Sequence, residues 1–562
     1  MTQSEDANVH PHFGFFNMAG SADTVTTLEE RAQQGVAPPP SKLHDGPTTG
    51  ELIIRAIRRY RNKIAFVNDT GTGPGTYTYD EMGQFIARIM QALKNEGLKK
   101  GDGICMLSAN KPEVFMTRLA TNLLGLRYTP LNPMGSADDH AYIVDNCEAR
   151  AVITDTKYAE RIPTLQAAAP RLKHALTMGP SEYGTDILAI AETFDVRDPW
   201  VESNPADICN LTYTGGTTGR SKGAIQRHHT SLANVLMSVA EWDWPKEIRT
   251  LCVTPLSHAA GTLILPTLVQ GGTVYIHDGF DAEKVLRAIE KDKITVLWLV
   301  PTMIYVLLDH PKLAATDTSS LELVVYGASP MSPTRLREAI ERFGQVFMQI
   351  YAQTEAPMNI TTLNTADHDL SRPERLASCG QPQIGVQVAV LDEDCMEVPQ
   401  GEVGEICVRG QLVMEGYWKR PEETAEALKG GWLHTGDMGR VDIEGFVYIV
   451  DRKKDMIISG GFNVYPKEVE DVLTSHPDVG QAAVIGVPDE KWGEAVKAVV
   501  VPKPGATLDA DALIAMVKEQ KGSILAPKTL DIVTEIPLTP VGKPDKKALR
   551  AQYWQDSDRQ VH

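Results

Sequence analysis

The sequence predicts an α/β body with largely parallel sheets, followed by a smaller α+β unit. Strand, turn and helix patterns alternate along most of the chain. Near residue 450 a glycine-punctuated stretch gives way to a charged segment followed by a helical pattern. The length of 562 residues agrees, because at about 150 residues per domain it allows three or four units. A hydrophobic fraction of 42% with 23% charged residues is typical of a folded chain and excludes wholesale disorder.

The first part of the chain is expected to be irregular, and order is expected from about Thr48. Apolar residues from Met82 to Leu93 recur at helical spacing, and Gly97 supplies a stop for that helix. Such alternation of strands and helices is typical of parallel sheets. Further strands are expected at residues 104–107, 294–300 and 321–326, and a further helix at residues 333–343.

A glycine-punctuated stretch from Gly401 to Gly416 predicts a small, mostly antiparallel β subdomain. The charged segment Asp451–Asp455 follows and is suited to be a hinge, because its polar backbone can move between two cores. A helix is expected after Pro466. The predicted organisation is an irregular arm at residues 1–45, a large domain at 46–451 and a small mobile domain at 452–562.

Charge and cysteine usage limit the possible partners. The net charge of −18 disfavours a broad nucleic-acid surface. Seven scattered cysteines without a CxxC pair fit neither a zinc ribbon nor a disulfide framework, and indicate a reducing compartment. The start has no signal-peptide pattern, and the apolar run Ile294–Leu308 is too short for a membrane span. We therefore expect a cytoplasmic protein without a transmembrane segment or a nucleic-acid partner.

The sharpest local signal is the string Leu-Thr-Tyr-Thr-Gly-Gly-Thr-Thr-Gly-Arg-Ser-Lys-Gly at residues 211–223. Glycines let the backbone approach a polyphosphate, and threonine hydroxyls supply donors or hold a metal. It is not a Walker A loop, because Ser221 stands where that motif has glycine before the lysine. The alternative is a flexible surface hairpin.

This string resembles the phosphate loop of the acyl-adenylate-forming superfamily, the AMP-dependent synthetases and ligases. The family usually has serine where Gly215 stands and proline where Ser221 stands. The resemblance makes Thr214 a catalytic and metal-binding residue. It also assigns the contacts with ATP to Thr214, Gly215, Gly216, Thr217, Thr218, Gly219 and Lys222.

The segment Tyr351–Glu355 is similar to the family's Tyr-Gly-x-Thr-Glu. The resemblance implies that Tyr351 stacks on adenine and that Thr354 contacts the α-phosphate. Glu355 would hold Mg²⁺, and a carboxylate suits this hard cation. Ala352 replaces the family's glycine along the acyl pocket, so its methyl group should narrow or shorten that pocket.

Three further segments match in the family's order. Gly327 and Ala328 lie in a string that resembles the adenine-binding turn, with Gly327 also along the acyl pocket; a serine-hydrolase elbow fails at Met331. The Thr-Gly-Asp string makes Asp437 the ribose ligand. His258 would lie beside the carboxylate and acyl group of the substrate acid, although a histidine beside apolar residues is often a core residue.

The charged segment and the C-terminal part complete the resemblance. It makes Arg452 a ribose or phosphate contact and Lys454 the pivot of the hinge. Lys543, in a Gly-Lys context, becomes the catalytic lysine that lies between carboxylate and α-phosphate. The residues expected to bind coenzyme A along the pantetheine tunnel are Ser459, Gly460 and Gly461.

The resemblance covers residues 50–550 and favours the acyl-CoA and aryl-CoA synthetase branch. It implies a large domain of two parallel-rich α/β subdomains and a small β subdomain, with a mobile α+β C-terminal domain. A carboxylic acid and ATP would give an acyl-adenylate, and coenzyme A would then take the acyl group. Mg²⁺ is expected with these substrates, no tightly bound organic cofactor is expected, and the protein would be a monomer or homodimer.

The acid is expected to be aromatic, cyclic or of short-to-medium chain length. Ala352 favours this, as do Trp244 and Trp298 if they line the pocket, although tryptophans more often fill a core. The alternatives are a long-chain fatty acyl-CoA synthetase and an adenylating enzyme that loads a separate carrier protein. A luciferase-like oxygenase and a nucleotide-binding sensor are weaker alternatives.

Overall fold

The structure is a computed structural model that describes residues 46–71, 73–214, 220–258, 260–459, 462–489, 492–503, 505–538 and 544–553. The predicted arm at residues 1–45 lies outside this range, as do two predicted site segments, Gly215–Gly219 and Gly460–Gly461, and Lys543. The predicted α/β fold is confirmed, because strands alternate with helices in two large sheets.

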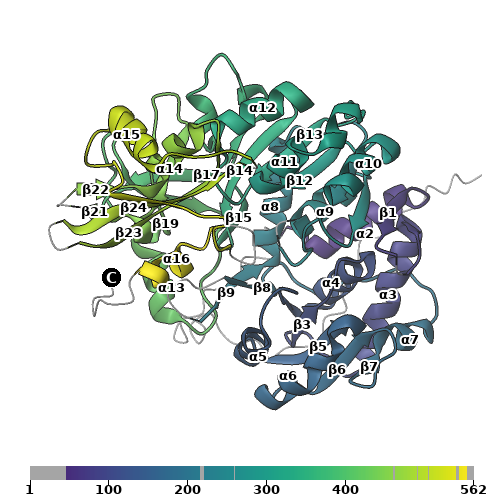
Figure 1. The fold of residues 1–562 in the computed structure, drawn as a ribbon. Helices are drawn as coiled ribbons and strands as arrows, with labels where there is room; N and C mark the ends of the chain where they lie inside the picture. Colours follow the sequence, from purple (N-terminus) through teal and green to yellow (C-terminus); the bar gives the residue numbers. More distant parts are fainter. Residues whose placement is uncertain are drawn as a thin grey trace, which may run out of the picture. The chain divides into compact units, whose positions relative to one another are not determined.

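Among the described residues, the largest sheet has nine strands in the order β16-β15-β14-β13-β12-β10-β11-β1-β2. Its centre, from β14 to β1, is parallel, and β15, β16 and β2 pair antiparallel at the edges. Figure 1 shows α9 to α12 beside β12 and β13. The strands are β1 (Ile64–Asp69), β2 (Thr76–Thr78), β10 (Arg249–Cys252), β11 (Thr273–His277), β12 (Val296–Leu299), β13 (Leu323–Gly327), β14 (Phe347–Gln353), β15 (Ala356–Leu363) and β16 (Gln381–Pro382). The accompanying helices are α2 (Thr49–Tyr60), α8 (His228–Glu241), α9 (Ala260–Val269), α10 (Ala282–Asp292), α11 (Pro301–Leu308) and α12 (Pro333–Phe343).

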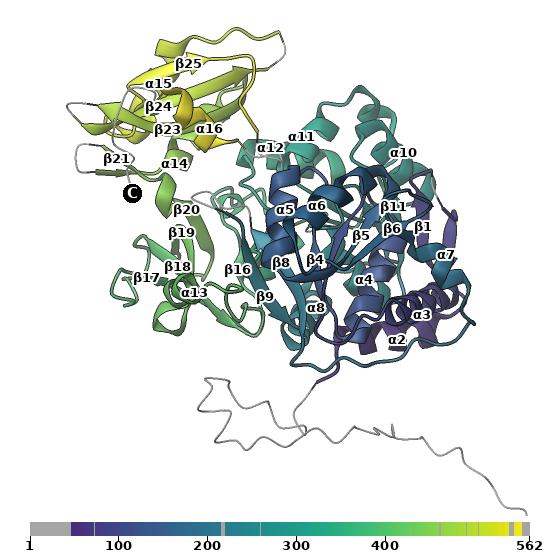
Figure 2. The same cartoon turned by 90° about the horizontal axis from the view of Figure 1, so that it is seen from below.

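A second sheet, of seven strands within the described part, has the order β7-β6-β5-β3-β4-β8-β9. All its pairs are parallel except β8 with β9. Figure 2 shows α5 and α6 over its middle strands. The strands are β3 (Gly103–Leu107), β4 (Arg127–Pro130), β5 (Ala149–Asp155), β6 (His174–Met178), β7 (Thr185–Asp186), β8 (Ile208–Thr214) and β9 (Lys222–Arg227). The helices are α3 (Tyr79–Asn95), α4 (Pro112–Leu124), α5 (Ala137–Asn146), α6 (Ile162–Ala168) and α7 (Ile187–Glu192).

The antiparallel β subdomain that the glycines predict is also present, and it is larger than the glycine-rich stretch. In the described chain it is a four-stranded sheet of order β17-β18-β19-β20. Its strands are β17 (Val386–Leu391), β18 (Gly404–Gly410), β19 (Leu433–Val441) and β20 (Val447–Arg452), with helix α13 (Pro421–Ala427) alongside.

After β20 the described residues form a mixed α+β unit. Its strands pair antiparallel except for β24 with β25, which is why its sheet does not resemble the two parallel ones. The strands are β21 (Ile457–Ser459), β22 (Phe462–Val464), β23 (Val479–Asp489), β24 (Gly493–Pro502) and β25 (Thr529–Ile532). The helices are α14 (Pro466–Ser475), α15 (Ala510–Lys521) and α16 (Lys546–Tyr553).

Local chemistry explains where several of these elements begin. The helix expected at Met82–Leu93 starts earlier, at Tyr79, because Thr78 and Glu81 form a reciprocal capping box. Helix α14 starts at Pro466 as expected, and its apolar face is buried. None of the described helices is both long and apolar enough to cross a membrane.

Candidate active site

The predicted phosphate loop joins β8 to β9, which form an antiparallel pair. Thr214 ends β8 and pairs in register with Lys222, which begins β9, so the structure describes both ends of the loop. The segment after β18 lies along β9, where the amide of Trp418 donates to the carbonyl of Gly223 (2.8 Å). The loop therefore leaves from the carboxyl end of β8, the edge at which parallel sheets bind ligands.

Glu355 lies beside the base of this loop. The Tyr417 hydroxyl donates to Glu355 Oε1 (2.7 Å), and the Lys222 ammonium group lies 5.0 Å from the centre of the Tyr417 ring. The Gln226 amide donates to the carbonyl of Thr354 (3.1 Å). Burial and the nearby Glu355 carboxylate raise the pKa of Tyr417, so its hydroxyl stays a donor at neutral pH. Two predicted residues from separate motifs, Lys222 and Glu355, thus meet at Tyr417, a residue that the sequence motifs do not include.

Asp437 is the most enclosed charged group of the candidate site. It lies on β19 with 3% of its surface exposed. Its Oδ2 accepts hydrogen bonds from the Tyr351 hydroxyl (2.6 Å) and the Gln353 amide (2.8 Å). Its Oδ1 forms an ion pair with Nε of Arg452 (2.5 Å). The structure therefore joins Tyr351, Asp437 and Arg452 from three motifs, and adds Gln353, which the motif comparison treats as variable.

The Tyr351 ring is buried in the apolar cluster between β14, β15 and the β subdomain. Burial and the Asp437 carboxylate raise its pKa strongly, so the phenol stays protonated and donates its hydrogen bond. This contact gives Tyr351 a role in holding Asp437. Its stacking on adenine stays a prediction.

The turn that carries Asp437 is fixed by a second carboxylate. Gly436 has φ +70°, and its amide donates to Glu405 Oε1 (2.9 Å). Oε2 of the same carboxylate lies 3.2 Å from His434 Nδ1 and 3.4 Å from Lys453 Nζ. Glu405 thereby links this turn to the charged segment predicted to be the hinge.

The predicted adenine-binding turn lies at the carboxyl end of β13. A Cβ atom at Gly327 would lie 2.4 Å from the carbonyl oxygen of Ile350 on β14, so only glycine fits there without a shift. Ala328 has φ +66°, a left-handed conformation that few residues with a Cβ atom adopt. Both features keep the turn close to β14, the strand that carries Tyr351 and Ala352.

His258 lies in the loop after β10 and is exposed, with Nδ1 2.8 Å from the Ser257 hydroxyl. The loop is held by Asn110, at the carboxyl end of β3 in the other large sheet. Asn110 accepts from the amide of Leu256 (3.0 Å) and donates to the carbonyls of Thr254 (3.0 Å) and His277 (3.1 Å). This buried amide joins the two parallel-rich subdomains at the loop that carries His258.

An apolar cluster follows this loop and contains the tryptophans considered for the acyl pocket. Trp298 is 4% exposed and packs with residues of α9 and β14. Trp244 stacks on Trp242 with ring centres 5.6 Å apart. Trp298 is therefore a core residue, and Trp244 packs at the edge of the same core.

The charged segment Asp451–Asp455 begins in the last two residues of β20, and a hydrogen bond ties its first residue to the unit that follows. Asp451 is buried and accepts from the amide of Lys467, in the first turn of α14 (2.8 Å). Lys454 lies in a short 3₁₀ turn and is exposed, and Ser459 is buried on β21. A backbone bridge between Leu538 and Pro544 lies on either side of the segment that contains Lys543.

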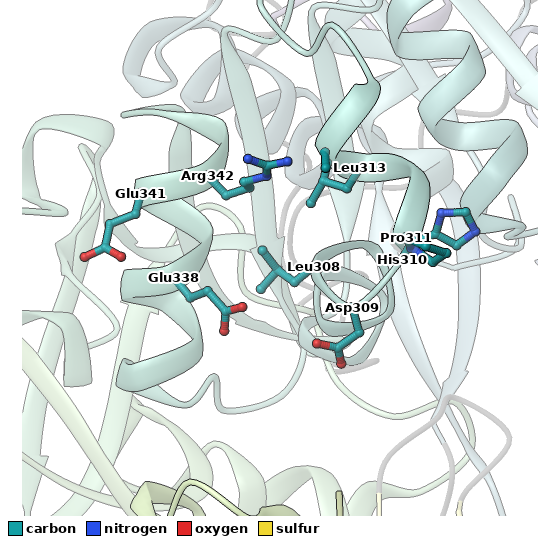
Figure 3. Close-up of a pocket in the computed structure, with 9 residues that line it drawn as sticks. Leu308, Asp309, His310, Pro311, Leu313, Glu338, Glu341 and Arg342 are labelled. Carbon is teal, nitrogen blue, oxygen red and sulfur yellow. The ribbon is translucent and has the colours of Figure 1, made fainter. Parts of the chain in front are cut away.

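Figure 3 shows an open hollow elsewhere, between α11 and α12. It has a volume of about 460 Å³, and its lining includes Leu308, His310, Glu338 and Arg342. The lining contains none of the predicted site residues. We therefore do not assign the chemistry to this hollow.

Comparison with known proteins agrees with the arrangement of motifs. The family model for AMP-binding enzymes matches residues 53–418, and the model for the AMP-binding enzyme C-terminal domain matches residues 468–543. The medium/long-chain-fatty-acid–CoA ligase FadD8 of Mycobacterium tuberculosis is 45% identical over 538 residues, which cover 92% of this chain and 93% of that protein. A feruloyl-CoA synthase of an Amycolatopsis species is 37% identical, over 86% of this chain and 95% of that protein.

A solved structure agrees with both the fold and the motifs. The amide bond synthetase McbA of Marinactinospora thermotolerans has a TM-score of 0.82 and 34% identity, and the match covers 90% of this chain and 99% of McbA. From these matches and the motifs gathered around Asp437 and Glu355, the chain belongs to the AMP-binding enzyme family, the acyl-adenylate-forming superfamily.

Proposed function

We propose that this protein is an ATP-dependent carboxylic acid–CoA ligase. It forms an acyl-adenylate with release of pyrophosphate and then transfers the acyl group to coenzyme A with release of AMP. The observation that carries the proposal is the buried Asp437 carboxylate, which meets Tyr351 and Arg452 from separate motifs. Two similar proteins, FadD8 and the feruloyl-CoA synthase, are named for this type of reaction.

The first half-reaction brings two anions together, so positive charge and alignment matter more than covalent catalysis. Thr214 and Lys222, at the two ends of the phosphate loop, contact the phosphates, and Asp437 binds the ribose. The amides and hydroxyls of the loop, from Gly215 to Gly219, add donors. Lys543 then places its ammonium group between the carboxylate and the α-phosphate.

Glu355 is suited to hold Mg²⁺ together with the Thr214 hydroxyl. The Tyr417 hydroxyl orients Oε1 of this carboxylate, which leaves Oε2 to bind a cation. The described residues contain no cluster of three or more His, Cys, Asp or Glu that could hold a metal. A single carboxylate completed by substrate phosphates is a usual Mg²⁺ site, and a cation held there would supply positive charge to the phosphate oxygens.

The second half-reaction needs the thiol of coenzyme A to reach the same carbonyl carbon. Rotation about Lys454 would withdraw Lys543 and bring in Ser459, Gly460 and Gly461. Large changes at a few hinge residues are typical of such rearrangements.

The test is Lys543→Ala, assayed separately for the two half-reactions. Pyrophosphate release from acid and ATP should fall by about 10²–10³-fold, because the variant lacks the positive charge that is expected to stabilise the transition state. Thioester formation from pre-made acyl-adenylate should largely persist. Lys547→Ala, an exposed lysine on α16, is the control. Equal loss in both assays would contradict the role of Lys543, and pyrophosphate release without consumption of coenzyme A would point to another acyl acceptor such as a carrier protein.

For the acid, we propose an aromatic, cyclic or short-to-medium-chain compound. Ala352 on β14 supports this, because its methyl group takes space that glycine leaves open in the family. FadD8 is named for medium and long chains, and this favours a long-chain acid as the second candidate. Pyrophosphate release measured across fatty acids of increasing length and a set of aromatic acids distinguishes the two.

A further inference from the structure

The two oxygens of the Asp437 carboxylate have different surroundings. Oδ2 is enclosed and accepts two hydrogen bonds, from the Tyr351 hydroxyl (2.6 Å) and from Gln353 Nε2 (2.8 Å). Oδ1 faces only Arg452 among the contacts described for it, and that side chain is 46% exposed. Oδ2 is therefore held by two donors of the protein, whereas the described partner of Oδ1 is a side chain that solvent reaches.

The orientation of the Gln353 amide is set by its acceptors. Its nitrogen donates both to Asp437 Oδ2 and to the carbonyl oxygen of Thr435 (2.7 Å). A carbonyl and a carboxylate can only accept, so the nitrogen has to face them. Gln353 thus binds the Thr-Gly-Asp turn at two points, and it connects β14 of the nine-stranded sheet to β19 of the β subdomain.

Hydrogen bonds to an ionised acceptor are stronger and more directional than those between neutral groups. Two donors on Oδ2 fix the plane of the carboxylate, and they do so without placing a second charge beside the ligand. The plane then determines where Oδ1 points. A side chain that fixes the plane of the Asp437 carboxylate therefore affects the hydrogen bond between Oδ1 and any ligand group that donates to it.

We propose that Gln353 is a positioning residue, which together with Tyr351 orients Asp437 so that Oδ1 accepts a hydrogen bond from a ribose hydroxyl of ATP. This inference rests on the proposed function, since it requires Asp437 to bind ribose. The amide nitrogen of Gln353 already donates to two acceptors of the protein. Its effect reaches the nucleotide only through the carboxylate.

The test compares ATP with 2′-deoxy-ATP and 3′-deoxy-ATP in acid-dependent pyrophosphate release. The preference is kcat/KM for ATP divided by kcat/KM for each deoxy analogue. Gln353→Met keeps the length of the side chain and removes the donor. We expect it to lower the preference about tenfold for the hydroxyl that Asp437 binds, as the loss of one hydrogen bond to a charged group implies. The change should lie in KM for ATP, with kcat within about threefold of wild type.

Gln349→Met is the matched control, because Gln349 lies on the same strand but accepts from the Tyr326 hydroxyl instead of contacting Asp437. It should leave the preference unchanged. Tyr351→Phe removes the other donor to Oδ2 and should lower the preference in the same way. It keeps the inference testable if Gln353→Met does not fold.

The inference is overturned if Gln353→Met and Tyr351→Phe both keep the wild-type preference while Asp437→Asn loses it. It is overturned as well if the wild-type enzyme accepts ATP and both deoxy analogues equally. Failure of the proposed function would look different, because wild-type protein would then release no pyrophosphate with any acid. A fall in preference in the Gln349→Met control equal to that in Gln353→Met would also overturn it, because the effect would then be structural.

Discussion

Replacing Asn110 should lower the free energy of unfolding far more than a usual substitution in a loop does. Its side chain is 6% exposed and makes three hydrogen bonds, one accepted from Leu256 and two donated to the carbonyls of Thr254 and His277. Asn110→Leu has a similar volume but leaves one amide and two carbonyls without partners. At about 1–3 kcal/mol for each unpaired buried group, and with some relaxation, we expect a loss of about 3–6 kcal/mol.

The amide orientation gives a second, sharper expectation. Two of the three hydrogen bonds are donated by Nδ2, so Asn110→Asp would place a carboxylate oxygen against two carbonyl oxygens. It should destabilise at least as much as Asn110→Leu, although it is closer in shape. Asn95→Leu, at an exposed position near the end of α3, should stay within about 0.5 kcal/mol of wild type.

The assay is thermal unfolding followed by circular dichroism, combined with acid-dependent pyrophosphate release. At about 2.1 cal/mol/K per residue, a large domain of about 400 residues that lost 3–6 kcal/mol would show a fall in Tm of about 4–7 °C. The acid should also show a raised KM, because the loop held by Asn110 carries His258. A Tm within about 1 °C of wild type (about 0.8 kcal/mol) for Asn110→Leu, or an Asn110→Asp variant more stable than Asn110→Leu, would refute the reasoning.

Three further predictions follow from single contacts. Gly327→Ala places a Cβ atom 2.4 Å from a backbone oxygen of β14 and should raise KM for ATP at least tenfold in steady-state assays. Gly279→Ala is the control, because a Cβ atom there meets nothing within 4 Å, and it should leave KM unchanged. Equal effects of the two variants on KM would contradict the steric argument. Tyr417→Phe frees the Glu355 carboxylate, so activity should need several-fold more Mg²⁺ in a titration, and an unchanged requirement would argue against Glu355 as the metal ligand. Burial lowers the pKa of His368 to about 4, so its neutral form stabilises the fold above pH 6.5 and about 3 kcal/mol is lost as the pH falls to 4. Urea unfolding at several pH values should show a smaller acid loss in His368→Gln, and an equal loss would assign the effect to other groups.

Much of the fold could be predicted from local pattern. The helix expected at residues 333–343 is α12, the strand expected at 104–107 lies in β3, and the short strands at 294–300 and 321–326 correspond to β12 and β13. These elements follow from apolar periodicity, prolines and glycines, which act within a few residues. The α3 start at Tyr79 also follows from a local interaction, the capping box at Thr78, although periodicity alone placed it later.

The sequence by itself determined the family and the residues that carry its motifs, because glycine, threonine, lysine and carboxylate have to stand in a fixed order to approach phosphate and ribose. Only the tertiary structure decided which side chains support them. Gln353 meets Asp437 across 84 residues of sequence, Tyr417 meets Glu355 across 62, and Asn110 holds Leu256 across 146. Such contacts arise where separate sheets pack together, and no spacing along the chain records them.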